Sequence, residues 1–148
     1  MATPQQLEYP LMTVPENAWS LCLWREARGE GCEGMRAVAW VIQNRSKAWN
    51  KTILEILTAP NQFTSMRDKK QPDGTWKFEF PPDADPQWES ARQIVGRLIT
   101  GQDNDDPTDG ALYYANLATA TSGWFFENIA ASPAHPKTVV IGHHTFFK

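Results

Sequence analysis

The pattern of apolar and polar residues predicts a first helix near the start of the chain. Pro15 suits the first turn of a helix, and Gly29 is suited to end one just after Arg28. Between them, apolar residues recur at a spacing that places them on one face: Trp19, Cys22 and Leu23. Residues 1–12 show no such period and contain two prolines, so we expect them to form a tail.

Further segments downstream also repeat apolar residues every three or four positions. A second helix is expected over about residues 33–46, with an apolar stripe of Met35, Val38, Ala39 and Ile42. A short helix is expected over about 51–57. Another is expected over about 85–100, closed by Gly101, with a core face of Trp88, Ala91, Val95, Leu98 and Ile99.

Extended structure is predicted in three places. The turn signal at 72–74, Pro-Asp-Gly, precedes alternating apolar and polar residues at 76–80, which indicates a small hairpin lobe. Residues 111–114 and 137–147 also favour extended structure. Helices joined to a few short strands, without a βαβ rhythm, predict a mainly helical α+β fold.

Composition fits one domain, which we place over residues 13–148. The chain has 148 residues and a formal net charge of -3, which argues against a nucleic-acid partner. No apolar run approaches the roughly 20 residues of a membrane span, and the start lacks the pattern of a secretory signal. We therefore expect a cytoplasmic protein without a membrane partner, and we expect its two cysteines, Cys22 and Cys32, to be free thiols.

The aromatic content is high, with seven Trp, seven Phe and three Tyr. Large aromatic side chains can fill a core. They can also line a groove for a ligand with flat apolar faces, such as a sugar ring. Composition does not choose between these two uses.

Glu26 occupies an unusual position for a carboxylate. It continues the apolar face of the first helix and lies in the last turn, where the negative end of the helix dipole disfavours a further negative charge. Both features are expected to raise its pKa toward the range that a general acid needs at neutral pH. The alternative is a structural ion pair with Arg25, Arg28 or a more distant arginine.

Two more carboxylates, Glu30 and Glu33, lie near the start of the second helix, where the dipole favours the charged form. One carboxyl group kept protonated beside others kept ionised is typical of acid-catalysed glycosyl transfer.

Several segments, in order, resemble the signature of the spore cortex-lytic type of cell wall hydrolase. The main ones are Glu-Ala-Arg-Gly-Glu at 26–30 and Ala-Val-Ala-Trp-Val-Ile-Gln-Asn-Arg at 37–45. The others are Gln-Phe-Thr-Ser at 62–65, Gly-Ala-Leu-Tyr-Tyr-Ala-Asn at 110–116, Thr-Ala-Thr-Ser at 119–122 and Ile-Gly-His-His-Thr-Phe at 141–146. Together they cover about residues 18–148.

The resemblance implies a lysozyme-like fold and cleavage of peptidoglycan between N-acetylmuramic acid and N-acetylglucosamine, with Glu26 as the catalytic acid/base. Most such enzymes are lytic transglycosylases that leave 1,6-anhydro ends. A hydrolytic muramidase remains an alternative, because Glu30 or Glu33 would supply the second carboxylate that hydrolysis requires. The candidate substrate-binding residues are Glu30, Gln62, Ser65, Tyr113, Tyr114 and Asn116.

Several of these candidates have structural alternatives. Tyr113 and Tyr114 would orient Glu26 or hold an acetamido group, but neighbours in a strand point to opposite faces, so we expect only one to reach the groove. Gln62 and Ser65 are equally suited to tie a loop to its own backbone, and Asn116 is equally suited to a turn.

Other functions are weaker fits. His135, His143 and His144 suggest a zinc amidase, but the His-Glu-x-x-His spacing is missing and adjacent histidines in a strand face opposite ways, so we expect no metal or cofactor. His144 is expected to form a structural hydrogen bond. A wall-binding module without catalysis is the third reading. The size and the apparent lack of a signal favour an endolysin-like, monomeric enzyme held in the cytoplasm until release.

Overall fold

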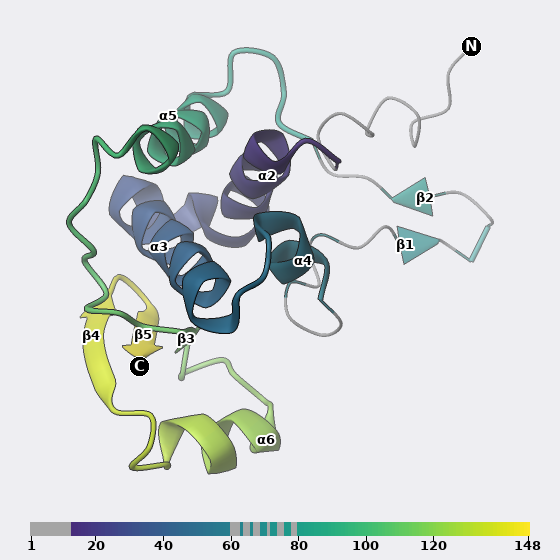
Figure 1. The fold of residues 1–148 in the computed structure, drawn as a ribbon. Helices are drawn as coiled ribbons and strands as arrows, with labels where there is room; N and C mark the ends of the chain where they lie inside the picture. The colour runs from purple at the N-terminus through teal and green to yellow at the C-terminus, as the bar shows by residue number, and fades with distance from the viewer. Residues whose placement is uncertain are drawn as a thin grey trace.

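The computed structural model of the protein describes residues 13–59, 63, 66, 69–70, 72–73, 76–77 and 80–148 (Figure 1). The expected tail over residues 1–12 lies outside the described residues, as do Gln62 and Ser65.

The first two long helices follow one another almost directly. Helix α2 spans Pro15–Ala27 and the 3-10 turn η1 spans Arg28–Glu30, so the helix ends where Gly29 predicted. Helix α3 spans Gly31–Trp49, which is longer at both ends than expected. It continues until Asn50 takes a left-handed conformation with φ 51°. Asparagine tolerates this conformation better than most residues, so it closes the helix without a glycine.

Local capping explains the next two helices. Helix α4 spans Ile53–Thr58, and Thr52 forms a capping box with Glu55, in which the Glu55 N–H donates to Thr52 Oγ1 (3.1 Å). Helix α5 spans Pro86–Thr100, preceded by the cap residue Asp85 and closed by Gly101 at φ 78°. The expected helices therefore all form.

The four helices α2, α3, α4 and α5 pack around one apolar core. The predicted stripes of α2 and α3 are buried. In α5 the predicted core face is wrong at one position, because Ile99 is 50% exposed while Ile94 is buried. At 100° per residue, Ile94 and Ile99 fall on opposite edges of the stripe formed by Ala91, Val95 and Leu98, and only the edge with Ile94 packs into the core.

Polar contacts join the helices to distant parts of the chain. Trp24 Nε1 donates to Asp85 Oδ2 (2.6 Å), which ties α2 to the start of α5. Arg36 Nε donates to Asp103 Oδ2 (2.7 Å), and Trp40 Nε1 donates to the same oxygen (3.1 Å). The acidic loop that follows α5 is therefore held against α3.

Two small sheets complete the fold. Strands β1 (Lys69–Lys70) and β2 (Trp76–Lys77) pair antiparallel, which confirms the expected hairpin. Strands β3 (Tyr113–Ala115), β4 (Lys137–Ile141) and β5 (His144–Phe147) form an antiparallel sheet in the order β3-β5-β4. Tyr114 pairs with Phe146 in this sheet, and Phe146 packs on Ala37 and Val41 of α3.

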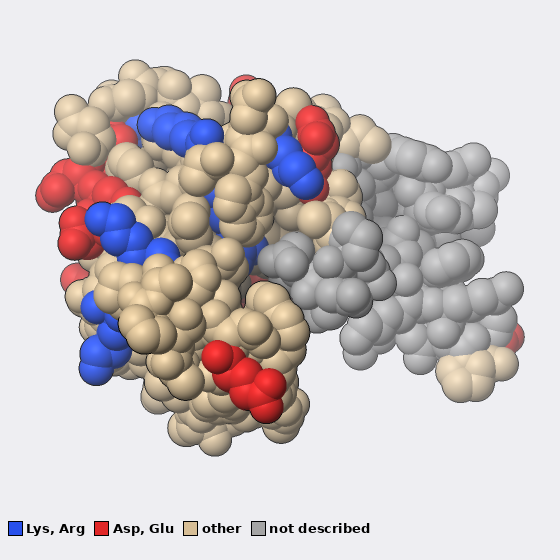
Figure 2. Space-filling model, turned by 60° about the horizontal axis from the view of Figure 1, so that its bottom comes forward, with Lys and Arg blue, Asp and Glu red and all other residues tan. Residues whose placement is uncertain are grey.

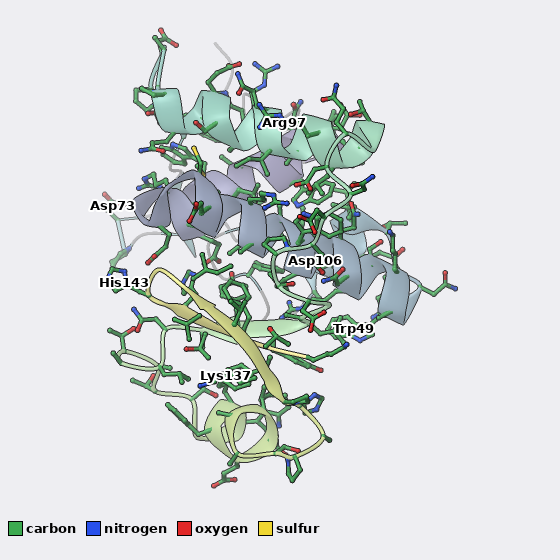
Figure 3. The ribbon with its side chains drawn as sticks, turned by 90° about the vertical axis from the view of Figure 1, so that its left-hand side faces the viewer. Trp49, Asp73, Arg97, Asp106, Lys137 and His143 are labelled. Carbon is green, nitrogen blue, oxygen red and sulfur yellow. The ribbon has the colours of Figure 1, made fainter. Side chains whose placement is uncertain are left out.

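One helical segment was not predicted. Helix α6 (Gly123–Phe125) continues into the π-helical turn η3 (Phe126–Ala130), and both lie across the sheet from the other helices (Figure 1, Figure 3). Ser122 caps the segment by accepting from the Phe125 N–H (3.2 Å). The aromatic residues of this segment do not recur at helical spacing, so Ser122 is the sequence feature that indicates a helix here.

The face seen in Figure 2 carries charges of both signs among larger uncharged areas, and some acidic and basic groups lie side by side. Within the described residues, no helix combines the length and the apolar character that crossing a membrane requires.

Candidate active site

Glu26 lies in the last turn of α2, half-buried, as the sequence predicted. Its nearest electrostatic neighbours include a thiol of its own helix and a phenol from the sheet. Burial raises the pKa of Cys22 and of Tyr114 well above their usual values, and the negative charge of Glu26 raises both further. The fold therefore brings Tyr114 of β3 close to Glu26.

Tyr114 is held by aromatic packing on the sheet. Its ring lies 5.0 Å from the His144 ring and 5.7 Å from the Phe146 ring, centroid to centroid. It also contacts both apolar clusters, the one between the helices and the one between α3 and the sheet. A phenol is protonated at neutral pH, and the raised pKa of Tyr114 extends this to more alkaline pH, so its hydroxyl can donate a hydrogen bond.

A buried cation forms part of the same region. The Arg45 side chain is only 6% exposed, and its Nε donates to the Leu112 carbonyl (2.6 Å). Its guanidinium lies over the rings of Trp49 (5.3 Å) and Tyr113 (5.6 Å). Burial lowers the pKa of Arg45, yet an arginine remains ionised. Arg45 is the last residue of the 37–45 segment, and the sequence pattern did not single it out as a functional residue. The sequence feature that could have indicated its role is its position among the apolar residues of α3.

A groove of about 670 Å³ opens beside these residues. It lies between the end of α3, strand β3 and helix α6, and its walls include Arg45, Trp49, Tyr113, Tyr114, Trp124 and Phe125. Both tyrosines line this groove, although we expected only one to reach it. All three residues of β3 line the groove, so side chains that point to opposite faces of the strand both reach it, with Tyr113 near Trp49 and Tyr114 near Glu26.

Glu30 lies against the turn between β4 and β5. Its side chain is 16% exposed; Oε2 accepts from the His143 N–H (3.0 Å), and Oε1 lies 3.1 Å from His143 Nδ1. These bonds, led by the backbone N–H, lower the pKa of Glu30. Figure 3 shows His143 at the opposite side of the view from Trp49. A substrate contact for Glu30 stays a prediction.

The adjacent histidines face different surroundings, as predicted. His143 is exposed beside Glu30, whereas the His144 ring packs on Tyr114. Buried Nδ1 of His144 has no hydrogen-bond partner among the described residues, so the expected structural hydrogen bond is not seen at this atom. Over the part of the chain that the structure describes, His, Cys, Asp and Glu side chains form no cluster suited to a metal ion.

Asn116, the next candidate, follows strand β3 directly. Asn116 Oδ1 accepts from the Ala118 N–H (3.1 Å), and its carbonyl accepts from the Ala120 N–H (2.9 Å), so it shapes a turn. A sugar contact for Asn116 stays a prediction. So do the roles of Gln62 and Ser65, which lie outside the described residues.

A helical core, a small antiparallel sheet and a carboxylate at the end of a buried helix define a lysozyme-like α+β fold. The cell wall hydrolase family matches residues 29–147, and the chain belongs to this family. Glu26 lies just before the matched range.

Relatives and solved structures agree with this assignment. The chain is 36% identical to a spore cortex-lytic enzyme of Oceanobacillus iheyensis over 85% of this chain and 38% of that protein. It is 33% identical to one from Bacillus subtilis, over 84% and 34% respectively. The chain thus spans well under half the length of these relatives.

The structure is similar to the catalytic domain of the germination-specific lytic transglycosylase SleB from Bacillus anthracis. The TM-score is 0.64 at 30% identity, covering 90% of this chain and 93% of that one. The SleB catalytic domain of Bacillus cereus gives the same TM-score at 31% identity, covering 90% of this chain and 89% of that one.

Proposed function

We propose that this protein cleaves the glycan strands of peptidoglycan between N-acetylmuramic acid and N-acetylglucosamine, as a lytic transglycosylase with Glu26 as its single acid/base. The observation that carries this proposal is the place of Glu26, half-buried in the last turn of α2 beside Tyr114, which lines the groove. The family and the similarity to SleB support it.

The reaction uses one carboxyl group twice. Glu26 donates its proton to the glycosidic oxygen while the bond from that oxygen to C1 of the muramic acid breaks. The 6-hydroxyl of the same muramic acid then attacks C1, and the Glu26 carboxylate takes the hydroxyl proton. The products are a new 4-hydroxyl end and a 1,6-anhydro end. No water is consumed, and Glu26 returns to its starting state.

The surroundings of Glu26 suit this double role. Tyr114, kept neutral by its raised pKa, can donate to the Glu26 carboxylate or to an acetamido oxygen and so fix one geometry. Hydrolysis would require a second carboxylate beside the substrate. Both oxygens of Glu30 are engaged by His143, which favours the route with one carboxylate.

The test compares Glu26→Gln with Glu33→Gln, which alters an exposed carboxylate in the first turn of α3. We expect Glu26→Gln to keep its melting temperature and to lose about a hundredfold or more in the rate of clearing isolated sacculi. Glu33→Gln should clear them at the wild-type rate. Undiminished turnover by Glu26→Gln would refute the assignment.

Mass analysis of the released fragments identifies the reaction. Muropeptides one water lighter than the hydrolysed form are expected from a transglycosylase. Reducing ends would indicate a muramidase, and release of peptides that a chelator stops would indicate a zinc amidase. Binding to sacculi without clearing would indicate a wall-binding module. The endolysin-like role, the cytoplasmic location before release and the monomeric state stay predictions.

A further inference from the structure

Trp124 of α6 is an exposed aromatic residue on the wall of the groove. Its exposed fraction is 63%, the largest among the large apolar side chains in the described part of the chain. Trp49, at the end of α3, lines the same groove and is 37% exposed. Placing two indole rings in water is costly, and two of them along one concave surface indicate a ligand with flat apolar faces.

The rest of the groove is polar enough for a sugar. The Arg45 cation, stacked beneath Trp49, forms one wall, and Thr121 and Ser122 line the groove near Trp124. A pyranose ring has apolar C–H faces and a polar edge, so it matches indole faces together with hydroxyl and guanidinium groups. An apolar peptide would cover the hydroxyls of Thr121 and Ser122 without offering them a hydrogen bond.

Contacts on either side of Trp124 fix the segment that carries it before any ligand binds. Ser122 caps the start of α6, and the neighbouring Phe125 packs edge-on against Phe147 of β5, with ring centroids 5.7 Å apart. A binding residue on a supported element loses little conformational freedom when the ligand binds, which favours affinity.

Tyr114 links the groove to the reacting carboxylate, since Glu26 itself is not one of the residues that line the groove. Tyr114 lines it and lies within electrostatic reach of Glu26, whereas Trp124 belongs to α6 on the far side of the sheet (Figure 1). A glycan strand with its scissile bond at Glu26 would therefore extend along the groove toward Trp124.

We propose that Trp124 and Trp49 form a saccharide subsite remote from the scissile bond, which binds an N-acetyl sugar further along the same glycan strand. This inference rests on the proposed function, because it assigns the groove to the same substrate. A short glycan ends before the subsite and a long one fills it, so the subsite selects for chain length.

The test measures binding in the Glu26→Gln background, where cleavage does not interfere. The probes are a disaccharide and a hexasaccharide of alternating N-acetylglucosamine and N-acetylmuramic acid, and the readout is Kd by calorimetry. Adding Trp124→Ala should weaken hexasaccharide binding by about tenfold and leave disaccharide binding unchanged. Trp124→Phe, which keeps an aromatic face, should recover most of the affinity.

The matched control is Phe126→Ala, an exposed aromatic residue that follows α6 directly and does not line the groove. It should leave both affinities unchanged. The subsite is overturned if Trp124→Ala leaves hexasaccharide binding intact, if it weakens both probes equally, or if Phe126→Ala has the same effect. Failure of the proposed function is separate, because it would appear as wild-type protein that does not clear sacculi.

Discussion

Cys22 and Cys32 show how strongly the surroundings of a residue decide its chemistry. Cys22 is buried in α2 next to Glu26, and burial followed by that negative charge raises its pKa well above the usual value. Cys32 is exposed at the start of α3. Both are free thiols, as predicted. Only a thiolate reacts readily with a disulfide reagent, so the two should differ in reactivity.

We therefore predict that a chromogenic disulfide reagent titrates one thiol in the native protein and two after unfolding. Cys32→Ser should remove the fast reaction and leave the melting temperature within a few degrees of the wild type. A native Cys32→Ser protein that still reacts fully within the same time would show that Cys22 is accessible.

Glu30 acts at the scale of elements, because it joins the start of α3 to the turn between β4 and β5. Its pKa is lowered in the folded state, chiefly by the backbone N–H of His143. A lowered folded-state pKa means that the contribution is present above the unfolded value of 4.5 and is lost as the pH falls through the folded value.

We predict that Glu30→Gln lowers the free energy of unfolding by about 1 kcal/mol near neutral pH. The difference from the wild type should shrink toward zero as the pH falls below 4.5 and through the lowered pKa of Glu30 in the folded state. Urea unfolding at several pH values measures this, with Glu33→Gln as the control for a nearby carboxylate that lacks the contact. A difference in the free energy of unfolding that stays constant down to low pH would contradict the role of the ionised Glu30.

Replacing either of two glycines by alanine should change the free energy of unfolding, in opposite directions for the two positions. Gly142, in the turn between β4 and β5, has φ +59°, and a Cβ there would collide with the Glu30 carboxylate. Gly96 lies inside α5, and a Cβ there meets nothing within 4 Å. We predict that Gly142→Ala lowers the free energy of unfolding by about 1–3 kcal/mol. Gly96→Ala should raise it by about 0.5–1 kcal/mol. Thermal melts of the two variants check both signs together.

At the scale of the whole molecule, α3 connects two apolar clusters. One of its faces packs in the core between the helices, while Ala37 and Val41 pack on Phe146 of the sheet. Tyr114 contacts both clusters. Since the same helix supports both sides, the helices and the sheet should unfold together.

We predict that Phe146→Ala, which empties a fully buried position, lowers the free energy of unfolding by about 3–5 kcal/mol. Circular dichroism in the far ultraviolet, which reports helicity, and in the near ultraviolet, which reports aromatic packing, should still change together in one unfolding transition. Val140→Ala, at an exposed position of β4, is the control and should change stability little. The prediction is wrong if Phe146→Ala loses the aromatic signal while its helices still unfold at the wild-type midpoint. The sheet would then be an independent folding unit.

The sequence by itself determined helices α2, α3, α4 and α5, the hairpin, the family and the position of Glu26 in the last turn of α2. These depend on local features: Pro15 in a first turn, Asp85 as a cap, Gly101 in a left-handed conformation and apolar residues at helical spacing. Such features act within a few residues, so a reader of the sequence can find them. The Glu-Ala-Arg-Gly-Glu segment likewise lies within one short stretch.

Only the tertiary structure decided what surrounds that carboxylate. It brought Tyr114 to Glu26, placed Arg45 against Tyr113, joined Glu30 to His143 and placed Trp124 on the wall of the groove that includes Tyr114. These partners come from elements far apart in the chain. Their proximity results from how the helices and the sheet pack, and no local propensity encodes that packing.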